Sequence, residues 1–187
     1  MKKSSIVLIV VIATVFIGVM SVISGYNGMI SKQEEVDSAL SNLDVMLQRR
    51  ADLIPNLVNT VKGYASHENE AIDKVTNART KLMNANNVEE KSQANNELTS
   101  SLKALMVIVE NYPDLKASQN FTQLSDELAG TENRISVARR DYNETVKSFN
   151  LNIKKFPNNL LAGMFGFEEA VYFEAQEASK EVPNVSF

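Results

Sequence analysis

Residues 36–82 read VDSALSNLDVMLQRRADLIPNLVNTVKGYASHENEAIDKVTNARTKL, and apolar side chains recur in this stretch at alternating steps of four and three. Such steps keep side chains on one face of an α-helix. Arg50 and Glu68 are the two exceptions among fourteen positions. A helix this long cannot bury its apolar face alone, so the pattern predicts one long helix packed against partner helices. The positions are Val36, Leu40, Leu43, Leu47, Arg50, Ile54, Leu57, Val61, Tyr64, Glu68, Ala71, Val75, Ala78 and Leu82.

Pro55 lies inside this pattern. Proline has no backbone N–H and its ring crowds the preceding turn of a helix. We therefore expect Pro55 to kink the helix or to restart it.

The chain after residue 82 predicts further helices. Asn87 followed by Glu90 is typical of a capping box, so a second helix is expected to begin there. It ends before Pro113, because the residue before a proline avoids helical dihedral angles. A third helix runs up to the stop at Pro157. The expected core positions are Leu98, Leu102, Leu105 and Val109 in the second helix, and Phe121, Leu124, Leu128, Ile135, Ala138, Tyr142 and Phe149 in the third.

The last segment is typical of a short helix from Glu168 to about Ser179. No stretch alternates between polar and apolar residues as a half-buried strand does. The sequence therefore predicts an all-α fold. We expect an antiparallel up-and-down helical bundle of three long helices and a short C-terminal helical segment, behind an N-terminal transmembrane helix.

The N-terminal helix is predicted from residues 6–23, which read IVLIVVIATVFIGVMSVI and carry no charge. At about 1.5 Å per residue they span roughly 27 Å, close to the hydrocarbon core of a bilayer. A helix satisfies its own backbone hydrogen bonds, which lipid cannot do. We therefore predict a short tail at residues 1–5 and an anchor at residues 6–24 that contacts the lipid bilayer through residues 6–23.

A secretory signal peptide is the rival interpretation of this segment. Its apolar core usually runs about 7–15 residues and ends in a small-x-small cleavage site. The apolar run here is longer, and Val22-Ile23-Ser24 matches such a site poorly. An uncleaved anchor is the interpretation we favour.

The charges beside the anchor indicate its orientation. Lys2 and Lys3 precede the span, whereas Glu34, Glu35 and Asp37 follow it. The positive-inside rule then places the N-terminus in the cytoplasm and the bundle outside. We expect a single-pass protein of the plasma membrane.

The rest of the chain is acidic and lacks the residues of familiar catalytic sites. Without Lys2 and Lys3, 17 basic and 23 acidic residues remain, a net charge of −6. A surface of that sign repels phosphate backbones, so no nucleic acid is expected as a partner. The chain has no cysteine, and His67 is its only histidine, too few for a zinc site of three or four ligands. We therefore expect no catalytic residues, no metal and no cofactor.

The two charges on the first apolar face need partners, because a charge on a core face is costly unless it is paired. If the second helix runs back along the first, the loop that follows it lies near the middle of the first helix. This register pairs Asp114 with Arg50 or Arg49, and Arg139 with Glu68. Structural pairing is the interpretation we favour, and a role in binding a partner is the alternative.

Four blocks of the sequence resemble the LemA family. Residues 47–58 (LQRRADLIPNLV) and 61–68 (VKGYASHE) are similar to its signature, and residues 110–117 (ENYPDLKA) match a second family block. Residues 131–135 (TENRI), with Ala138-Arg139 and Tyr142-Asn143, match a further block. The resemblance runs in order from about Tyr26 to Phe173. It implies an N-terminal anchor and an antiparallel four-helix-bundle domain in a bacterial membrane protein with no established enzymatic activity. The candidate structural or interaction residues are Arg49, Arg50, Asp52, Pro55, Asn56, Glu68, Tyr112, Pro113, Asp114, Glu132, Arg134, Arg139, Tyr142 and Asn143.

The apolar stretch 160–167 has two interpretations. We favour packing against the end of the bundle. The alternative is an exposed apolar patch for a partner or for the membrane surface.

These observations predict a bundle domain at residues 25–180, followed by a C-terminal tail at residues 181–187. The leading hypothesis is a membrane-anchored scaffold or interaction protein of the bacterial envelope, with a membrane or envelope protein as its partner. One alternative is an enzyme or ligand-binding protein with an unfamiliar site of Arg, Tyr and carboxylates inside the bundle. The other is a self-assembling structural protein that forms a homo-oligomer.

Overall fold

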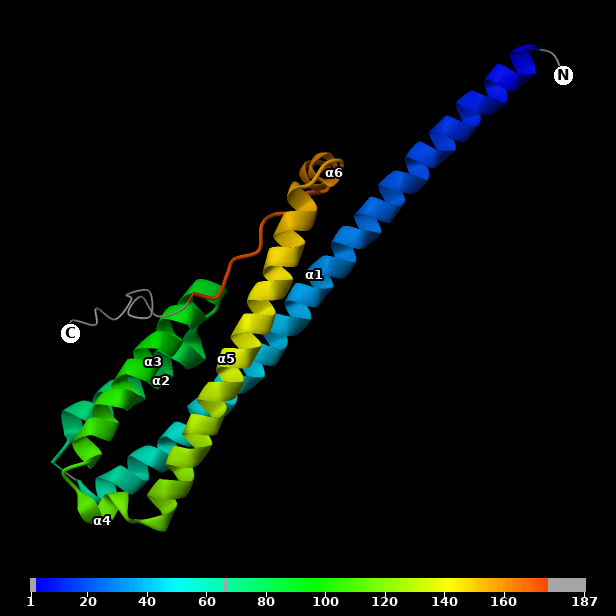
Figure 1. Cartoon of the computed structure of the whole chain (residues 1–187). Coiled ribbons are helices and arrows are strands. Elements are labelled where there is room, and N and C mark those ends of the chain that lie inside the picture. The colour runs from blue at the N-terminus through cyan, green and yellow to red at the C-terminus, as the bar shows by residue number, and fades with distance from the viewer. Residues whose placement is uncertain (1–2, 66, 175–187) are drawn as a thin grey trace, which may run out of the picture. The chain divides into compact units, whose positions relative to one another are not determined.

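The computed structural model describes residues 3–65 and 67–174, with side chains from residue 7 onward, and contains helices and no strand in these ranges. The predicted all-α class is therefore confirmed. Figure 1 shows α1 (Lys3–Tyr64), α2 (Asn69–Asn84), α3 (Val88–Val109), α4 (Pro113–Lys116), α5 (Gln119–Lys154) and α6 (Asn158–Phe165). Two compact bodies are present. The first body comprises residues 3–39 and 144–170, and the second body residues 40–143 and 171–174.

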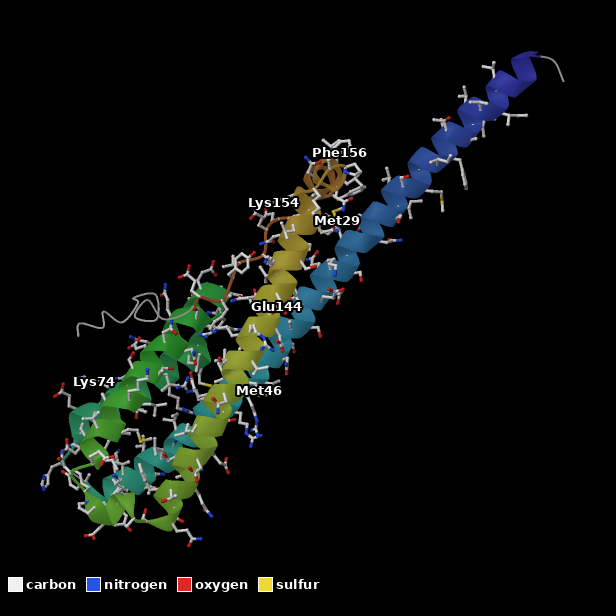
Figure 2. All side chains as sticks on the ribbon, viewed as in Figure 1. Met29, Met46, Lys74, Glu144, Lys154 and Phe156 are labelled. Carbon is white, nitrogen blue, oxygen red and sulfur yellow. The ribbon has the colours of Figure 1, made fainter. Side chains whose placement is uncertain are left out.

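In the first body, α1 begins with an exposed apolar segment. All side chains from Val7 to Ile23 are exposed, and Figure 2 shows side chains leaving this part of the helix on all sides. α1 begins at Lys3 and continues past residue 24 without a break, so residues 3–5 of the expected tail are helical. Among the described residues, α1 is the one helix long and apolar enough to cross a membrane.

Directly after this apolar segment, α6 packs against α1. A Cβ built on Gly25 would lie 2.9 Å from Cδ1 of Leu161, so the absence of a side chain at residue 25 permits the close approach. The ring of Tyr26 meets the ring of Phe165 edge-on at a centroid distance of 4.8 Å. Ala162 is buried as well. Leu161 and Ala162 thus pack as the favoured interpretation of residues 160–167 expects, whereas Leu160 and Met164 are exposed and Phe165 remains 49% exposed despite its ring contact.

The second body contains four helical segments: α1 from residue 40, α2, α3, and α5 up to residue 143. α4 links α3 to α5, and Figure 1 shows that successive segments run in opposite directions. Lys81 of α2 bridges to Glu97 of α3 at 2.7 Å, as expected for antiparallel neighbours. The predicted apolar faces supply the core, with the fully buried residues Leu43, Ile54, Leu57, Val61, Val75, Leu98, Leu105 and Ile135.

The prediction of one continuous helix over residues 36–82 is wrong. α1 ends at Tyr64 and α2 begins at Asn69, and the chain reverses between them. Tyr64 is exposed and Glu68 is half-buried in the connection, so neither is a core position of a long helix. The apolar positions from Ala71 to Leu82 are buried, but they belong to a separate helix.

Pro55 does not interrupt α1, which continues to Tyr64, so the expected restart is wrong. Because proline has no N–H, the carbonyl of Ala51 loses its intrahelical partner. Nε of Arg79, on α2, donates to that carbonyl oxygen at 2.8 Å. Ala51 is fully buried, so this bond satisfies an acceptor that water cannot reach.

The second helix predicted from the sequence, expected to begin at Asn87, is α3, and its predicted start is confirmed because Asn87 is the N-cap of α3. The side chain of Asn87 accepts from the Glu90 backbone N–H at 2.8 Å, and the Glu90 carboxylate accepts from the Asn86 N–H at 2.8 Å. These reciprocal bonds satisfy donors that the first turn leaves open.

The predicted helix from Glu168 to about Ser179 is wrong where the structure describes it. Residues 167–174 are not helical, and residues 175–179 lie outside the described residues, as does the expected tail at residues 181–187. The short C-terminal helix is instead α6. Side chains of α5 bind backbone groups of Ala170, Val171 and Phe173, and Ser92 of α3 binds the carbonyl of Glu174, so these groups are satisfied without a helix.

Candidate functional site

A buried polar network centred on Arg50 lies in the core of the second body. Arg50, on α1, is 4% exposed. Its Nη1 donates to Oδ1 of Asn95 at 2.8 Å and to Oγ1 of Thr99 at 3.0 Å, both on α3. The same nitrogen lies 2.8 Å from Oε2 of Glu132, on α5, in an ion pair. Three helices therefore converge on one guanidinium.

The positive charge of Arg50 is buried, and the negative charge of Glu132 compensates it. Desolvation by burial lowers the pKa of Arg50, and the attraction of Glu132 opposes that shift. Nε of Arg50 and Oε2 of Glu132 are buried and have no hydrogen-bond partner of adequate geometry among the described residues. Because the guanidinium is held by a carboxylate, an amide and a hydroxyl, the network can fix the register of α1, α3 and α5. It contains no activated nucleophile.

The predicted partner of Arg50 was wrong. Asp114 lies in α4 and is exposed, and Arg49 is exposed on α1. The structure places Glu132 beside Arg50 instead. The reason is the chain reversal after Tyr64, which moves the loop after α3 away from the middle of α1.

The predicted pairing of Glu68 with Arg139 is also wrong. The hydroxyl of Tyr112 donates to the Glu68 carboxylate at 2.8 Å, and no ion pair joins Glu68 to Arg139 within the described ranges. This hydrogen bond is the main cause of a raised pKa at Tyr112. It ties the connection between α1 and α2 to the connection that Tyr112 makes between α3 and α4.

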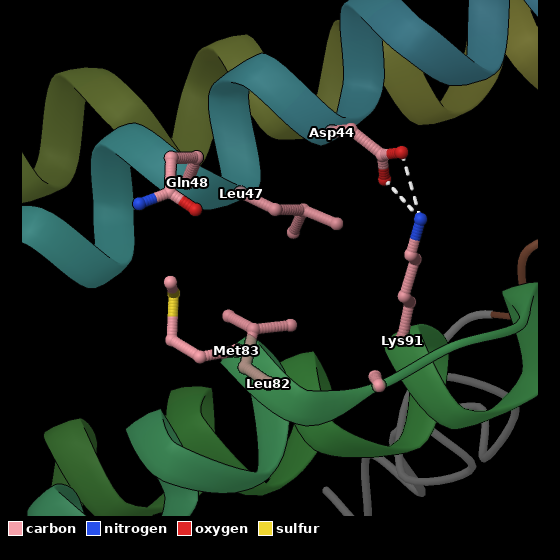
Figure 3. A pocket seen from close by; sticks show the side chains of 7 residues that line it. Asp44, Leu47, Gln48, Leu82, Met83 and Lys91 are labelled. Carbon is pink, nitrogen blue, oxygen red and sulfur yellow. Dashed lines mark hydrogen bonds and ion pairs between the residues drawn. The ribbon is translucent and has the colours of Figure 1, made fainter.

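A polar-edged pocket of about 240 Å³ lies between α1 and the connection from α2 to α3. In Figure 3, Asp44 and Lys91 face each other across one side, and the Lys91 Nζ–Asp44 Oδ2 distance is 2.7 Å. Leu47, Leu82 and Met83 line the other side. The charges neutralise each other, so the pocket offers no free charge from this pair.

A second pocket, of about 340 Å³ and mostly apolar, lies on the α1–α5 face of the second body. Met46 and Val137 supply apolar walls, and Arg134 and Asp141 stand at its edge. Of the candidate residues, Arg134 is the one that lines this groove. Its open form and mostly apolar lining surface are typical of a protein-contact surface rather than of a reaction site.

Tyr142 and Asn143, on α5, hold the segment that follows α6. The Tyr142 hydroxyl donates to the Val171 carbonyl at 2.7 Å. The Asn143 amide accepts from the Phe173 N–H at 2.9 Å and donates to the Phe173 carbonyl at 3.0 Å. Phe173 is thereby buried at 1% exposure. Two predicted residues thus position an extended segment.

Sequence reasoning missed Asn150, which makes the same double hydrogen bond in the first body. Its amide donates to the Ala170 carbonyl and accepts from the Ala170 N–H, each at 2.9 Å. The available signal was the spacing of seven residues from Asn143, which places both amides on one face of α5. Ser92 was missed as well, and its hydroxyl donates to the Glu174 carbonyl at 2.9 Å.

The remaining candidate residues are not brought into one site. Asp52, Pro55 and Asn56 are exposed on α1, and Asp52 accepts from Gln48 at 2.9 Å. Pro113 is at the start of α4. His67 is exposed, and no group of three His, Asp or Glu residues that could hold a metal ion occurs in the described part of the chain.

Comparison with known proteins adds a family. The model of the LemA family matches residues 39–187. Protein LemA of Metamycoplasma hominis is 33% identical over 159 residues, a match that covers 82% of this chain and 71% of that protein. Magnetosome protein MamQ 2 of Paramagnetospirillum magneticum is 27% identical over 179 residues, covering 82% of this chain and 66% of that protein. Magnetosome protein MamQ of Magnetospirillum gryphiswaldense is 25% identical with the same coverage. The chain thus spans just under two thirds of the length of these MamQ proteins.

Proposed function

The chain belongs to the LemA family, and from that premise we propose that it is a membrane-anchored helical scaffold that presents its bundle to other proteins of the bacterial envelope. One observation carries the proposal. The segment from Val7 to Ile23 exposes its apolar side chains on all sides, and the same helix then supplies the core of a helical bundle. Such a chain needs lipid around one end and water around the other.

The polar groups of the second body support a scaffold more than an enzyme. Arg50 is held by Glu132, Asn95 and Thr99, and none of these is a nucleophile aimed into a cavity. The pockets described above are open at the surface, and the Asp44–Lys91 pair is mutually neutralised. A scaffold requires a stiff surface of fixed shape, which buried polar contacts between helices favour.

Anchoring is tested by placing charges in the middle of the apolar segment. Val11→Lys combined with Val15→Lys should move the full chain out of the alkali-resistant membrane fraction, because a lysine at the centre of a membrane helix costs about 2.5–3.5 kcal/mol. Val107→Lys, at an exposed position of α3, is the control and should remain in the membrane. Retention of the double variant would contradict a spanning helix.

The scaffold role is tested by crosslinking the full chain in intact membranes and identifying captured proteins by mass spectrometry. We expect a defined envelope protein crosslinked to residues of the second body. The capture should persist when residues 7–23 are replaced by an unrelated apolar span, since the anchor then only tethers. Crosslinks confined to copies of this chain would favour the self-assembling alternative and overturn the proposal.

A further inference from the structure

The outward face of α6 is apolar and uncovered. Met164 is 77% exposed and Leu160, one turn earlier, is 59% exposed. Phe156, just before the helix, is 80% exposed, and Figure 2 shows it at the α6 end of α5. Three large apolar side chains in nine residues are thus left in water, which is more than scattered exposure of single residues.

A neighbouring face of α6 packs against α1. Leu161 and Phe165 each follow the exposed Leu160 and Met164 by one residue, so they lie about 100° further around the helix axis. They pack against Gly25 and Tyr26. Phe167, after the helix, adds a second edge-on contact to the Tyr26 ring at 5.8 Å. The helix therefore holds its exposed stripe in a set direction on α1.

The docking point lies level with the end of the apolar segment. Gly25 follows Ile23 by two residues, which is about 3 Å of helical rise. Tyrosine at this position is typical of the boundary between lipid and water. A side chain held beside Gly25 and Tyr26 is consequently at headgroup level if residues 6–23 span the hydrocarbon core.

We propose that α6 is an interfacial helix that inserts Phe156, Leu160 and Met164 into the headgroup and upper acyl region of the bilayer crossed by α1. The proposal rests on the anchoring part of the proposed function. The partner is the lipid surface because α6 packs against α1 directly after the exposed apolar segment at residues 7–23, within one body.

Charge gives this contact little help. Lys154 is paired with Glu169 at 2.7 Å, and Glu168 is exposed beside it, which offsets the exposed Lys155. Attraction to anionic lipid is therefore weak, and apolar burial is the driving force. Uncharged phosphatidylcholine bilayers should suffice, with little dependence on salt.

The test uses the absence of native cysteine, so that each introduced cysteine is unique. The full chain carrying Met164→Cys is labelled with an environment-sensitive fluorophore and reconstituted in phosphatidylcholine vesicles. Quenching is measured with nitroxides attached near the headgroup end of the acyl chain, with nitroxides deep in the acyl chain, and with aqueous iodide. Phe156→Cys gives a second, independent label outside α6.

Two further labels provide the controls. Val15→Cys lies in the middle of the apolar segment and reports whether α1 is inserted. Glu144→Cys lies on α5 in the same body, ten residues before Lys154 and thus about 15 Å further along that helix. It should be quenched by iodide and by neither nitroxide.

We expect shallow nitroxides to quench residues 156 and 164 at least about threefold more than Glu144→Cys, with iodide quenching reduced to a similar degree. Val15→Cys should respond to the deep nitroxide. If Val15→Cys responds while residues 156 and 164 behave like Glu144→Cys, the interfacial helix is wrong and the anchor stands. If Val15→Cys does not respond either, the anchor itself is wrong. Protection from iodide without nitroxide quenching would indicate cover by a second copy and would also overturn the proposal.

A double variant adds a functional check on the same surface. Leu160→Ser with Met164→Ser should lower shallow quenching of a Phe156→Cys label by about threefold, while Val15→Cys in the same background is unchanged. Circular dichroism should show retained helicity. Unchanged quenching at residue 156 in a folded double variant would contradict insertion through this stripe.

Discussion

At the scale of the residue, the Arg50–Glu132 pair predicts that a second substitution, at Arg50, offsets the loss of stability caused by a substitution at Glu132. Glu132→Ala strands a buried guanidinium, so it should lower the free energy of unfolding by about 1.5–3 kcal/mol. Arg50→Met removes that stranded charge while keeping the volume. The double variant should therefore be no less stable than Glu132→Ala alone, as measured by urea unfolding of the full chain in detergent.

The control for this rescue is Arg49→Met, a change at the exposed neighbouring arginine. It should leave the cost of Glu132→Ala unchanged within a few tenths of a kcal/mol. Losses that simply add in the Arg50 double variant would show that the two side chains do not act as a pair.

Tyr112 gives a prediction about pH. Its hydroxyl donates to Glu68, and ionisation would break that bond, so the pKa is raised above the ordinary 10.0. The contribution of this bond to stability is complete below pH 10 and is lost as pH rises through the higher folded pKa. In the ultraviolet absorbance titration, the difference between wild type and Tyr112→Phe should show this late ionisation.

Glu68→Ala is the matched variant for that titration. It removes the acceptor of the hydrogen bond, which is the main cause of the raised pKa, together with the negative charge, so Tyr112 should ionise closer to its ordinary range. An unchanged titration of Tyr112 in Glu68→Ala would assign the raised pKa to another cause.

At the scale of the element, the continuity of α1 through Pro55 depends on a side chain from another helix. Arg79→Met leaves the buried Ala51 carbonyl without a donor and should cost about 1–3 kcal/mol of unfolding free energy. In a Pro55→Ala background, the restored N–H of residue 55 donates to that carbonyl. The cost of Arg79→Met should then fall by half or more.

An exposed arginine serves as the reference for this comparison. Arg140→Met, on the surface of α5, should have nearly the same small effect with or without Pro55. An equal cost of Arg79→Met in both backgrounds would mean that the Ala51 contact does not explain the unbroken helix.

Asn150 predicts how the segment after α6 is held. Asn150→Ala removes both partners of the Ala170 backbone, so the Ala170 amide should exchange with deuterium at least about tenfold faster. Asn159→Ala, at an exposed position of α6, is the control and should leave that rate unchanged. Equal exchange rates of the Ala170 amide in wild type and Asn150→Ala would show that Asn150 does not protect this amide.

Sequence periodicity predicted the apolar faces of the helices, but it did not predict that the chain reverses between Tyr64 and Asn69. The apolar steps of four and three continue from Val61 through Ala71 and Val75 in the same phase, so the pattern carries no mark of the break. Gly63, one residue before the end of α1 at Tyr64, was the available stop signal. Both predicted ion pairs failed for this reason, because their register assumed a straight helix over residues 36–82.

The need for a partner at Arg50 was predictable, whereas its identity was not. A charge on an apolar face must be compensated, and the sequence shows that much. The choice of Glu132, Asn95 and Thr99 depends on how three helices align, which no local pattern encodes. Over residues 168–174, the expected helix was overridden in the same way, by side chains of α5 that are distant in sequence.

At the scale of the whole molecule, the charges around the apolar segment predict the topology. A fluorescent protein that matures only in the cytoplasm should stay dark when fused after Phe187, a position outside the described residues. The same reporter fused before Met1 should be bright. Two lysines before the span and three carboxylates after it are the reason. A bright C-terminal fusion would reverse the orientation.

The absence of any break in α1 between Val7 and Ala39 has a mechanical consequence. A stiff helix cannot absorb a change of tilt at a linker, so the first body must swing with it. A thicker or thinner bilayer changes the preferred tilt of a span of fixed length. α6, bound to the side of that rod at Gly25, would then sweep through an arc and rise or sink at the surface. A change in bilayer thickness would thus be converted by α1 into a change in the depth of α6 at the membrane surface.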